Sequence, residues 1–207
     1  MIQMINNPSI MILFQLGKTD ELECFNDEKS KELLRLLQPQ NLIDLLNIYC
    51  LNREGIENNL NVFIKNKLIP KNINYLHSLM ENSLKDTSGI LIYEEQFVDI
   101  VKQLAGLSHQ ESEDIRKALA TKQAELIKEY FKKFHDGCMS NEMFLQEYRY
   151  KGHPLTAINN IWEYLFHLLA VNGKYYWGEC EPPRGIAGFF QRLFTGQKPS
   201  WPTLTCG

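Results

Sequence analysis

The chain has 207 residues, of which 44% are hydrophobic, and its formal net charge is −3. This length allows a buried core, organised as one domain or as one domain with an appendage. The charge excludes a strongly basic protein, although a local basic patch can still bind nucleic acid. No apolar run approaches the ~20 residues of a membrane span, and the start lacks the features of a signal peptide, so we expect a cytoplasmic chain without a membrane partner.

Helical patterns dominate the chain and predict an all-α fold. The apolar spacing predicts helices at residues 30–37, 41–51, 57–67, 72–84, 94–104, 108–119, 124–134 and 155–171. Gly106 is a predicted C-cap, and Ser108 with Glu111 forms a predicted capping box. The short apolar segment 89–93 is expected to be extended. We therefore predict a helical domain over residues 1–171.

Residues 172–207 differ in composition from the rest of the chain. Glycine, proline and aromatic residues are concentrated there, which is typical of a loop-rich tail. The five cysteines of the chain are irregularly spaced and form no CxxC, which favours reduced thiols. His135 and Cys138 are half of a metal site at most, so no metal is predicted.

Motifs for catalysis and cofactors are absent from the sequence. It has no GxxxxGK[ST] phosphate loop and no GxSxG elbow, and no cofactor is predicted. It also has no Asp-x-Asp, whereas two-metal nucleotidyl transfer requires carboxylates that share metal ions. No catalytic residue is therefore predicted.

One cationic cluster is a candidate binding site. Arg116, Lys117 and Lys122 lie close together, and Lys128, Lys132 and Lys133 follow. Such side chains can bind phosphates through charge-assisted hydrogen bonds. The alternative is a solvated face whose cations pair with nearby glutamates, and composition alone favours that alternative.

Residues 89–119 form the most specific motif of the chain: the segment begins GILIYEEQ and continues through FVDIVKQLAG to EDIRKAL. It resembles the alpha subunit of bacterial DNA polymerase III, a family C polymerase. The family has GIxLYQEQVMxIAxxLAG followed by LRRAMGKK at this place, in register. Weaker similarities are the LFQL at 13–16, the helix pair at 34–51, the FHDGC at 134–138 with Asn141, and the IWE at 161–163.

The resemblance covers roughly residues 12–170 and implies the helical fingers, which in the family bind the incoming nucleotide and face the template. It implies phosphate contacts of nucleotide or primer-template DNA at Arg53, Arg116, Lys117 and Lys122. The family's acidic palm motif has no equivalent here. Its Arg-Pro-Gly-Pro is replaced by residues 53–56, REGI, and its basic run loses one lysine and the glycine.

Three functions stay open at this stage. The first is a non-catalytic module in DNA replication, acting on nucleic acid or with a separate palm-bearing polypeptide. The second is a truncated polymerase remnant, for example from a phage or mobile element. The third is a repurposed fold that serves as a protein-interaction module.

Overall fold

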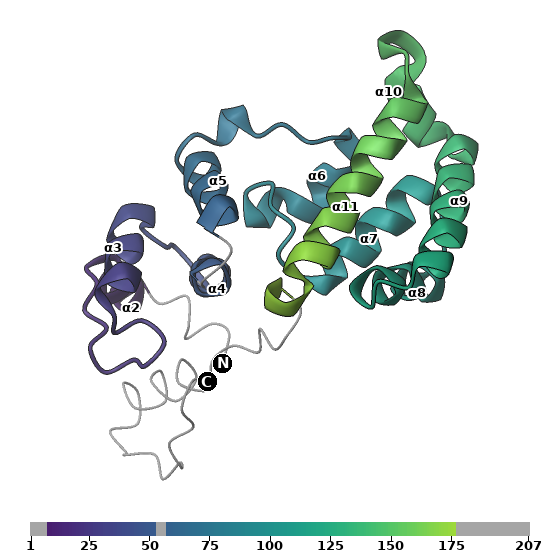
Figure 1. The fold of residues 1–207 in the computed structure, drawn as a ribbon. Helices are drawn as coiled ribbons and strands as arrows, with labels where there is room; N and C mark the ends of the chain where they lie inside the picture. Colours follow the sequence, from purple (N-terminus) through teal and green to yellow (C-terminus); the bar gives the residue numbers. More distant parts are fainter. Residues whose placement is uncertain (1–7, 53–56, 177–207) are drawn as a thin grey trace. The chain divides into compact units, whose positions relative to one another are not determined.

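The computed structural model describes residues 8–52 and 57–176, and within these ranges every regular element is helical (Figure 1). The predicted all-α fold is thus confirmed. The elements are α2 (Pro8–Gln15), α3 (Glu28–Leu37), α4 (Leu42–Leu51), α5 (Glu57–Leu68), η1 (Pro70–Asn72), η2 (Ser78–Met80), α6 (Glu81–Leu84), η3 (Lys85–Thr87), α7 (Glu94–Ala105), α8 (His109–Ala120), α9 (Ala124–Ser140), α10 (Glu142–Lys151) and α11 (Pro154–Tyr176).

Two compact units divide the described residues, with the boundary after Tyr49. In the first unit, the buried Phe14 ring meets Phe25 edge-on at a centroid distance of 5.9 Å. Asp27 caps α3, because its carboxylate accepts a hydrogen bond from the Ser30 amide. Phe14 belongs to the LFQL element of the family resemblance, so this element contributes to the core of the unit.

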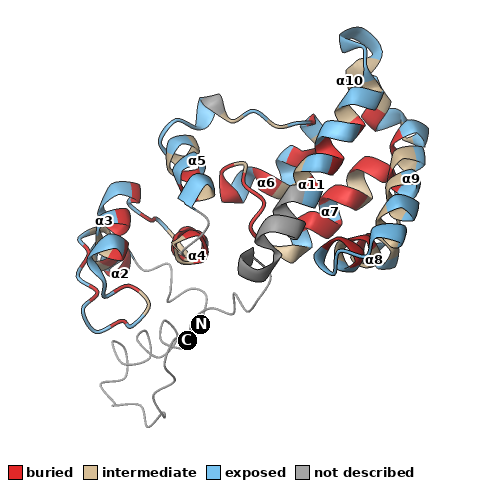
Figure 2. Ribbon diagram, in the orientation of Figure 1, coloured by how far each residue is buried: buried red, intermediate tan, exposed pale blue. Residues whose placement is uncertain are grey.

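The second unit is built around α7, which contacts both α8 and α9, while α11 packs against the same two helices. Its apolar positions Phe97, Ile100 and Leu104 are fully buried, and Figure 2 shows α7 as largely buried. Gly106 ends the helix with a left-handed φ of 65°. The Ser108 capping box then starts α8. These predicted boundaries are confirmed because local side chains determine them.

The predicted helix over residues 72–84 is wrong. The backbone over 73–77 is not helical, and two short 3-10 turns flank α6. The cause is His77, whose Nδ1 accepts a hydrogen bond from the Leu79 amide while Nε2 donates to the Phe144 carbonyl. Side-chain bonds to the backbone thus replace helical bonds in this stretch.

Helix ends and cysteines require further corrections. The helix predicted at 124–134 continues through Gly137 to Ser140, and α2 and α10 were not predicted. The helix predicted to end at 171 continues to Tyr176, and residues 177–207 of the expected tail lie outside the described residues. Cys24 and Cys138 are not in disulfide bonds. Cys50 is disulfide-bonded, so the expectation of reduced thiols is wrong there.

None of the helices in residues 8–52 and 57–176 is long and apolar enough to cross a bilayer.

Candidate nucleic-acid interface

The four predicted phosphate-binding residues differ in their surroundings. Arg116 and Lys117 lie in the last turns of α8, and Lys122 follows the end of that helix. Arg53 lies outside the described residues.

Arg116 is occupied by carboxylates. Its Nη1 lies 3.2 Å from Oε1 of Glu94 on α7, and its Nη2 lies 3.1 Å from Oε2 of Glu113 on α8. The Arg116 side chain is only 13% exposed. Burial raises the pKa of Glu94, although the Arg116 charge acts against that shift. Arg116 therefore joins α7 to α8 through Glu94. Its second ion pair, with Glu113, is the kind of pairing with a nearby glutamate that the solvated-face alternative expected.

Lys117 and Lys122 differ from Arg116 in their exposure and in their contacts within the described part of the chain. Both residues are exposed, and no carboxylate among the described residues lies within ion-pair distance of either. Lys122 has a left-handed φ of 55°. Its amide donates to the Leu119 carbonyl at 3.2 Å, which closes the last turn of α8. The two lysines are therefore available at the carboxyl end of α8.

Within the described part of the chain, the lysines of α9 also include some with and some without a carboxylate partner. Lys133 pairs with Glu111 at 2.7 Å, and Lys128 pairs with Glu125 at 3.1 Å. The Lys133 and Ser108 hydrogen bonds lower the pKa of Glu111 to about 2. Lys132 is exposed and has no carboxylate partner in the part of the chain that the structure describes. Ion pairs with nearby glutamates, which the solvated-face alternative expected, are thus present at Lys128 and Lys133.

Gln96, in the YEEQ segment, is a fold residue. Its Oε1 accepts hydrogen bonds from the Ile92 and Tyr93 amides at 2.8 and 2.9 Å. Its Nε2 donates to the Ser83 carbonyl at 2.7 Å and to the Thr87 hydroxyl at 2.8 Å. All four bonding positions of this buried amide are therefore used. Gln96 ties the extended segment before α7 to the turns around α6.

The FHDGC segment also builds the fold. A Cβ added at Gly137 would lie 2.3 Å from the Ala105 carbonyl oxygen, so only glycine allows α9 to approach the end of α7 this closely. Asn141 Nδ2 donates to the Gln103 and Leu104 carbonyls at 2.8 and 2.9 Å. Asn141 thus caps the carboxyl end of α7. Sequence reasoning missed these roles because both contacts join residues more than 30 positions apart.

The possible half of a metal site does not assemble. Among the described residues, no group of three or more metal-binding side chains comes together. His135 Nδ1 lies 3.0 Å from Oδ1 of Asp136. Cys138 is fully buried, and burial raises the pKa of its thiol to about 12. A neutral, buried thiol is a poor metal ligand.

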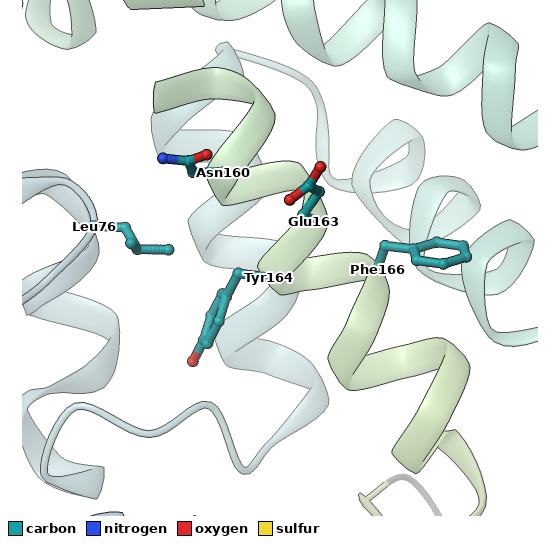
Figure 3. Close-up of a pocket in the computed structure, with 5 residues that line it drawn as sticks. All are labelled: Leu76, Asn160, Glu163, Tyr164 and Phe166. Carbon is teal, nitrogen blue, oxygen red and sulfur yellow. The ribbon is translucent and has the colours of Figure 1, made fainter. Parts of the chain in front are cut away.

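An open pocket of about 600 Å³ lies beside α11 (Figure 3). Its lining residues are Leu76, Asn160, Glu163, Tyr164 and Phe166. Asn160 and Tyr164 lie on the side of α11 that faces Leu76, whereas the Phe166 ring points away from Leu76. Burial raises the pKa of Tyr164 to about 12. The lining includes a carboxylate and no cation, so the pocket does not suit phosphates.

Comparison with known proteins identifies relatives over most of the chain. Residues 2–142 match the bacterial DNA polymerase III alpha subunit finger domain. DNA polymerase III subunit alpha of Aquifex aeolicus is 28% identical over 206 residues, covering 94% of this chain and 17% of the relative. The Mycoplasma pneumoniae and Bacillus subtilis subunits are each 30% identical, cover 61% of this chain, and are themselves covered to 14% and 12%. The chain thus spans less than a fifth of the length of these relatives.

Proposed function

This chain belongs to the bacterial DNA polymerase III alpha subunit finger domain family, and from that premise we propose that it binds primer-template DNA or a nucleotide in DNA replication. The binding groups in this proposal are phosphates, and the chain does not catalyse polymerisation by itself. The names of the relatives support a role in replication. The proposal places the chain in the cytoplasm, as the sequence predicts.

One observation carries the proposal: Lys117 and Lys122 are exposed and have no carboxylate partner within residues 8–52 and 57–176, whereas the neighbouring Arg116 is held by two carboxylates. A free ammonium group binds a phosphate without first breaking an ion pair. Lys117 and Lys122 therefore make the direct contacts in this proposal. Arg116 would contribute by exchanging a carboxylate for a phosphate, and Arg53 stays a predicted contact.

The proposal assigns the chemistry to a separate palm-bearing polypeptide. The sequence has no Asp-x-Asp pair to align two metal ions with the attacking and leaving oxygens. We expect no primer extension by the purified chain with magnesium and all four nucleotides. Extension that is lost on mutation within this chain would contradict this part of the proposal.

Binding is tested with the double variant Lys117→Ala/Lys122→Ala and fluorescence anisotropy on labelled primer-template DNA. Two lost phosphate contacts should reduce the slope of log affinity against log salt by about 1.8. The matched control is Lys65→Ala/Lys85→Ala, which removes the same charge from exposed positions on α5 and η3. Equal affinity of the double variant and the wild type, with an unchanged circular dichroism spectrum, would reject the proposed site.

A second candidate function is a protein-interaction module made from a polymerase remnant. The observation that favours it is the set of exposed large apolar side chains in the second unit, which includes Leu68, Ile69, Leu76 and Phe166. Exposed apolar surface is typical of protein contacts. Affinity purification from the native host with mass spectrometry separates the candidates, because the first predicts a palm-bearing polymerase polypeptide among the captured proteins.

A further inference from the structure

The turn between α10 and α11 is a second exposed region with cations. It lies beyond residue 142, where the match to the finger domain ends. Figure 1 shows this turn at the end of the hairpin, away from α7 and α8. The hairpin tip is defined here as residues 149–153, and all five are exposed. A ligand of this surface would therefore bind outside the residues that match the finger-domain model.

The tip combines an aromatic ring with cations. Tyr150 is 98% exposed, and the exposed Arg149 and Lys151 lie on either side of it in sequence. No carboxylate among the described residues pairs with Arg149. Lys151 is bound to Glu147 at 2.9 Å but its side chain is 67% exposed. An isolated exposed aromatic residue is ordinary on a surface, but flanking cations make this one suited to a ligand with rings and phosphates.

The helix that carries the tip is firmly anchored. The Phe144 ring stacks on the buried His77 ring with the centroids 4.6 Å apart. Glu147 accepts a hydrogen bond from the Ser78 amide at 2.9 Å, and the Tyr148 ring packs 5.2 Å from Phe144. These contacts fix α10 to the turn at residues 77–78. The exposed tip is thus presented from a rigid support, which lowers the entropy lost on binding.

We propose that the hairpin tip binds single-stranded DNA, with a base stacked on Tyr150 and phosphates bound by Arg149 and Lys151. The bases of a duplex are stacked on one another, so an exposed ring can stack only on an unpaired base. One cation precedes the ring and one follows it in sequence, so a single strand that crosses the end of α10 can bring a base to the ring and phosphates to the two cations. The choice of DNA over RNA rests on the proposed function in replication, whereas the stacking contact does not.

The test uses the 207-residue chain and a fluorescein-labelled 20-nucleotide thymidine strand, with a duplex of equal length for comparison. Tyr150→Ala should weaken binding to the single strand by about tenfold, the typical loss of one stacked base, whereas Tyr150→Phe should retain it. Arg149→Ala/Lys151→Ala should reduce the salt slope by about 1.4. Met143→Ala, an exposed change on the same helix, is the matched control and should have no effect.

Three results would overturn the proposal. They are the absence of single-strand binding by the wild type, an unchanged affinity in Tyr150→Ala with an intact circular dichroism spectrum, and an equal loss on the duplex. The Lys117→Ala/Lys122→Ala variant, measured on primer-template DNA, reports separately on the α8 site. If the tip variants bind the single strand as the wild type does while Lys117→Ala/Lys122→Ala lowers the salt slope on primer-template DNA, only the hairpin-tip proposal is rejected.

Discussion

Two glycines show how differently two regions of the second unit are built. At the crossing of α7 and α9, an added Cβ at Gly137 would lie 2.3 Å from the Ala105 carbonyl oxygen. At the hairpin tip, no atom lies within 4 Å of a Cβ added at Gly152. The crossing is packed to the limit of backbone contact, whereas the tip is open to solvent.

This contrast in packing distinguishes residues that make contacts inside the fold from residues that are exposed to solvent. Gln96, Gly137 and Asn141 belong to the segments that resemble the polymerase family, and all three make contacts inside the unit. The candidate binding residues Lys117 and Tyr150 are instead exposed. A resemblance carried by residues with such internal contacts is therefore strong evidence for the fold and indirect evidence for function.

The largest expected effect is at the crossing. Gly137→Ala should lower the free energy of unfolding by about 3 kcal/mol, because the backbone of α7 must move to admit the methyl group. Gly152→Ala meets no neighbouring atom but strains a backbone at φ 64° and ψ 175°, a region almost confined to glycine, and should cost about 2 kcal/mol. Urea unfolding of both variants measures the contrast. Equal unfolding midpoints for the two variants would show that the crossing is less tightly packed than the structure indicates.

A smaller loss is expected at Gln96. Gln96→Ala leaves the Ile92 amide and the Ser83 carbonyl without their hydrogen-bond partner, which should cost about 2 kcal/mol. Gln103→Ala removes one long bond of 3.3 Å to the Ser83 hydroxyl and serves as the control. Chemical denaturation compares the two. If Gln103→Ala is as destabilising as Gln96→Ala, the Gln96 network is not what holds the segment before α7.

Acid should weaken the anchor of the hairpin. Burial disfavours the charged form of Glu147, but hydrogen bonds from Ser78 and Lys151 outweigh it and lower the pKa from 4.5 to about 2. The unfolded state therefore binds the proton first, and the contribution of Glu147 to stability is complete above pH 4.5 and lost as the pH falls toward 2.

Urea unfolding at pH 7, 4.5 and 3 tests this expectation with Glu147→Gln. The variant should be less stable at pH 7 and should lose less stability than the wild type between pH 4.5 and 3. Glu142→Gln, an exposed change at the start of the same helix, is the control. Parallel pH profiles for Glu147→Gln and the wild type would exclude Glu147 as the source of the acid sensitivity.

The smallest effect on stability is expected at the tip. Tyr150→Ala should change the free energy of unfolding by no more than about 0.5 kcal/mol, because the 98% exposed ring buries almost no surface. Thermal unfolding followed by circular dichroism gives the value. A cost above 1 kcal/mol would mean that the ring contributes to the fold, and the contrast with the crossing would then fail.

Local signals in the sequence predicted the ends of α7 and α8. Gly106 and the Ser108–Glu111 capping box act within a few residues, so they are readable without knowledge of the fold. The helix predicted at 72–84 failed for the opposite reason. His77 bonds to Phe144, a residue 67 positions away, and no local pattern reveals that partner.

At the candidate site too, local sequence signals identified the residues, whereas contacts between distant residues determined their surroundings. Sequence identified the cations Arg116, Lys117 and Lys122, but not which of them was already neutralised. Glu94 is 22 positions from Arg116 and reaches it only because α7 packs against α8.

The sequence by itself determined the helical class, the caps around Gly106 and Ser108 and the family, since these depend on local patterns and on residues in register. The tertiary structure decided that Gly137 admits no side chain, that Arg116 is paired, and that Lys117 and Tyr150 are exposed. Packing decides such properties because ion pairing and close contact depend on the distance between helices, which no single segment specifies.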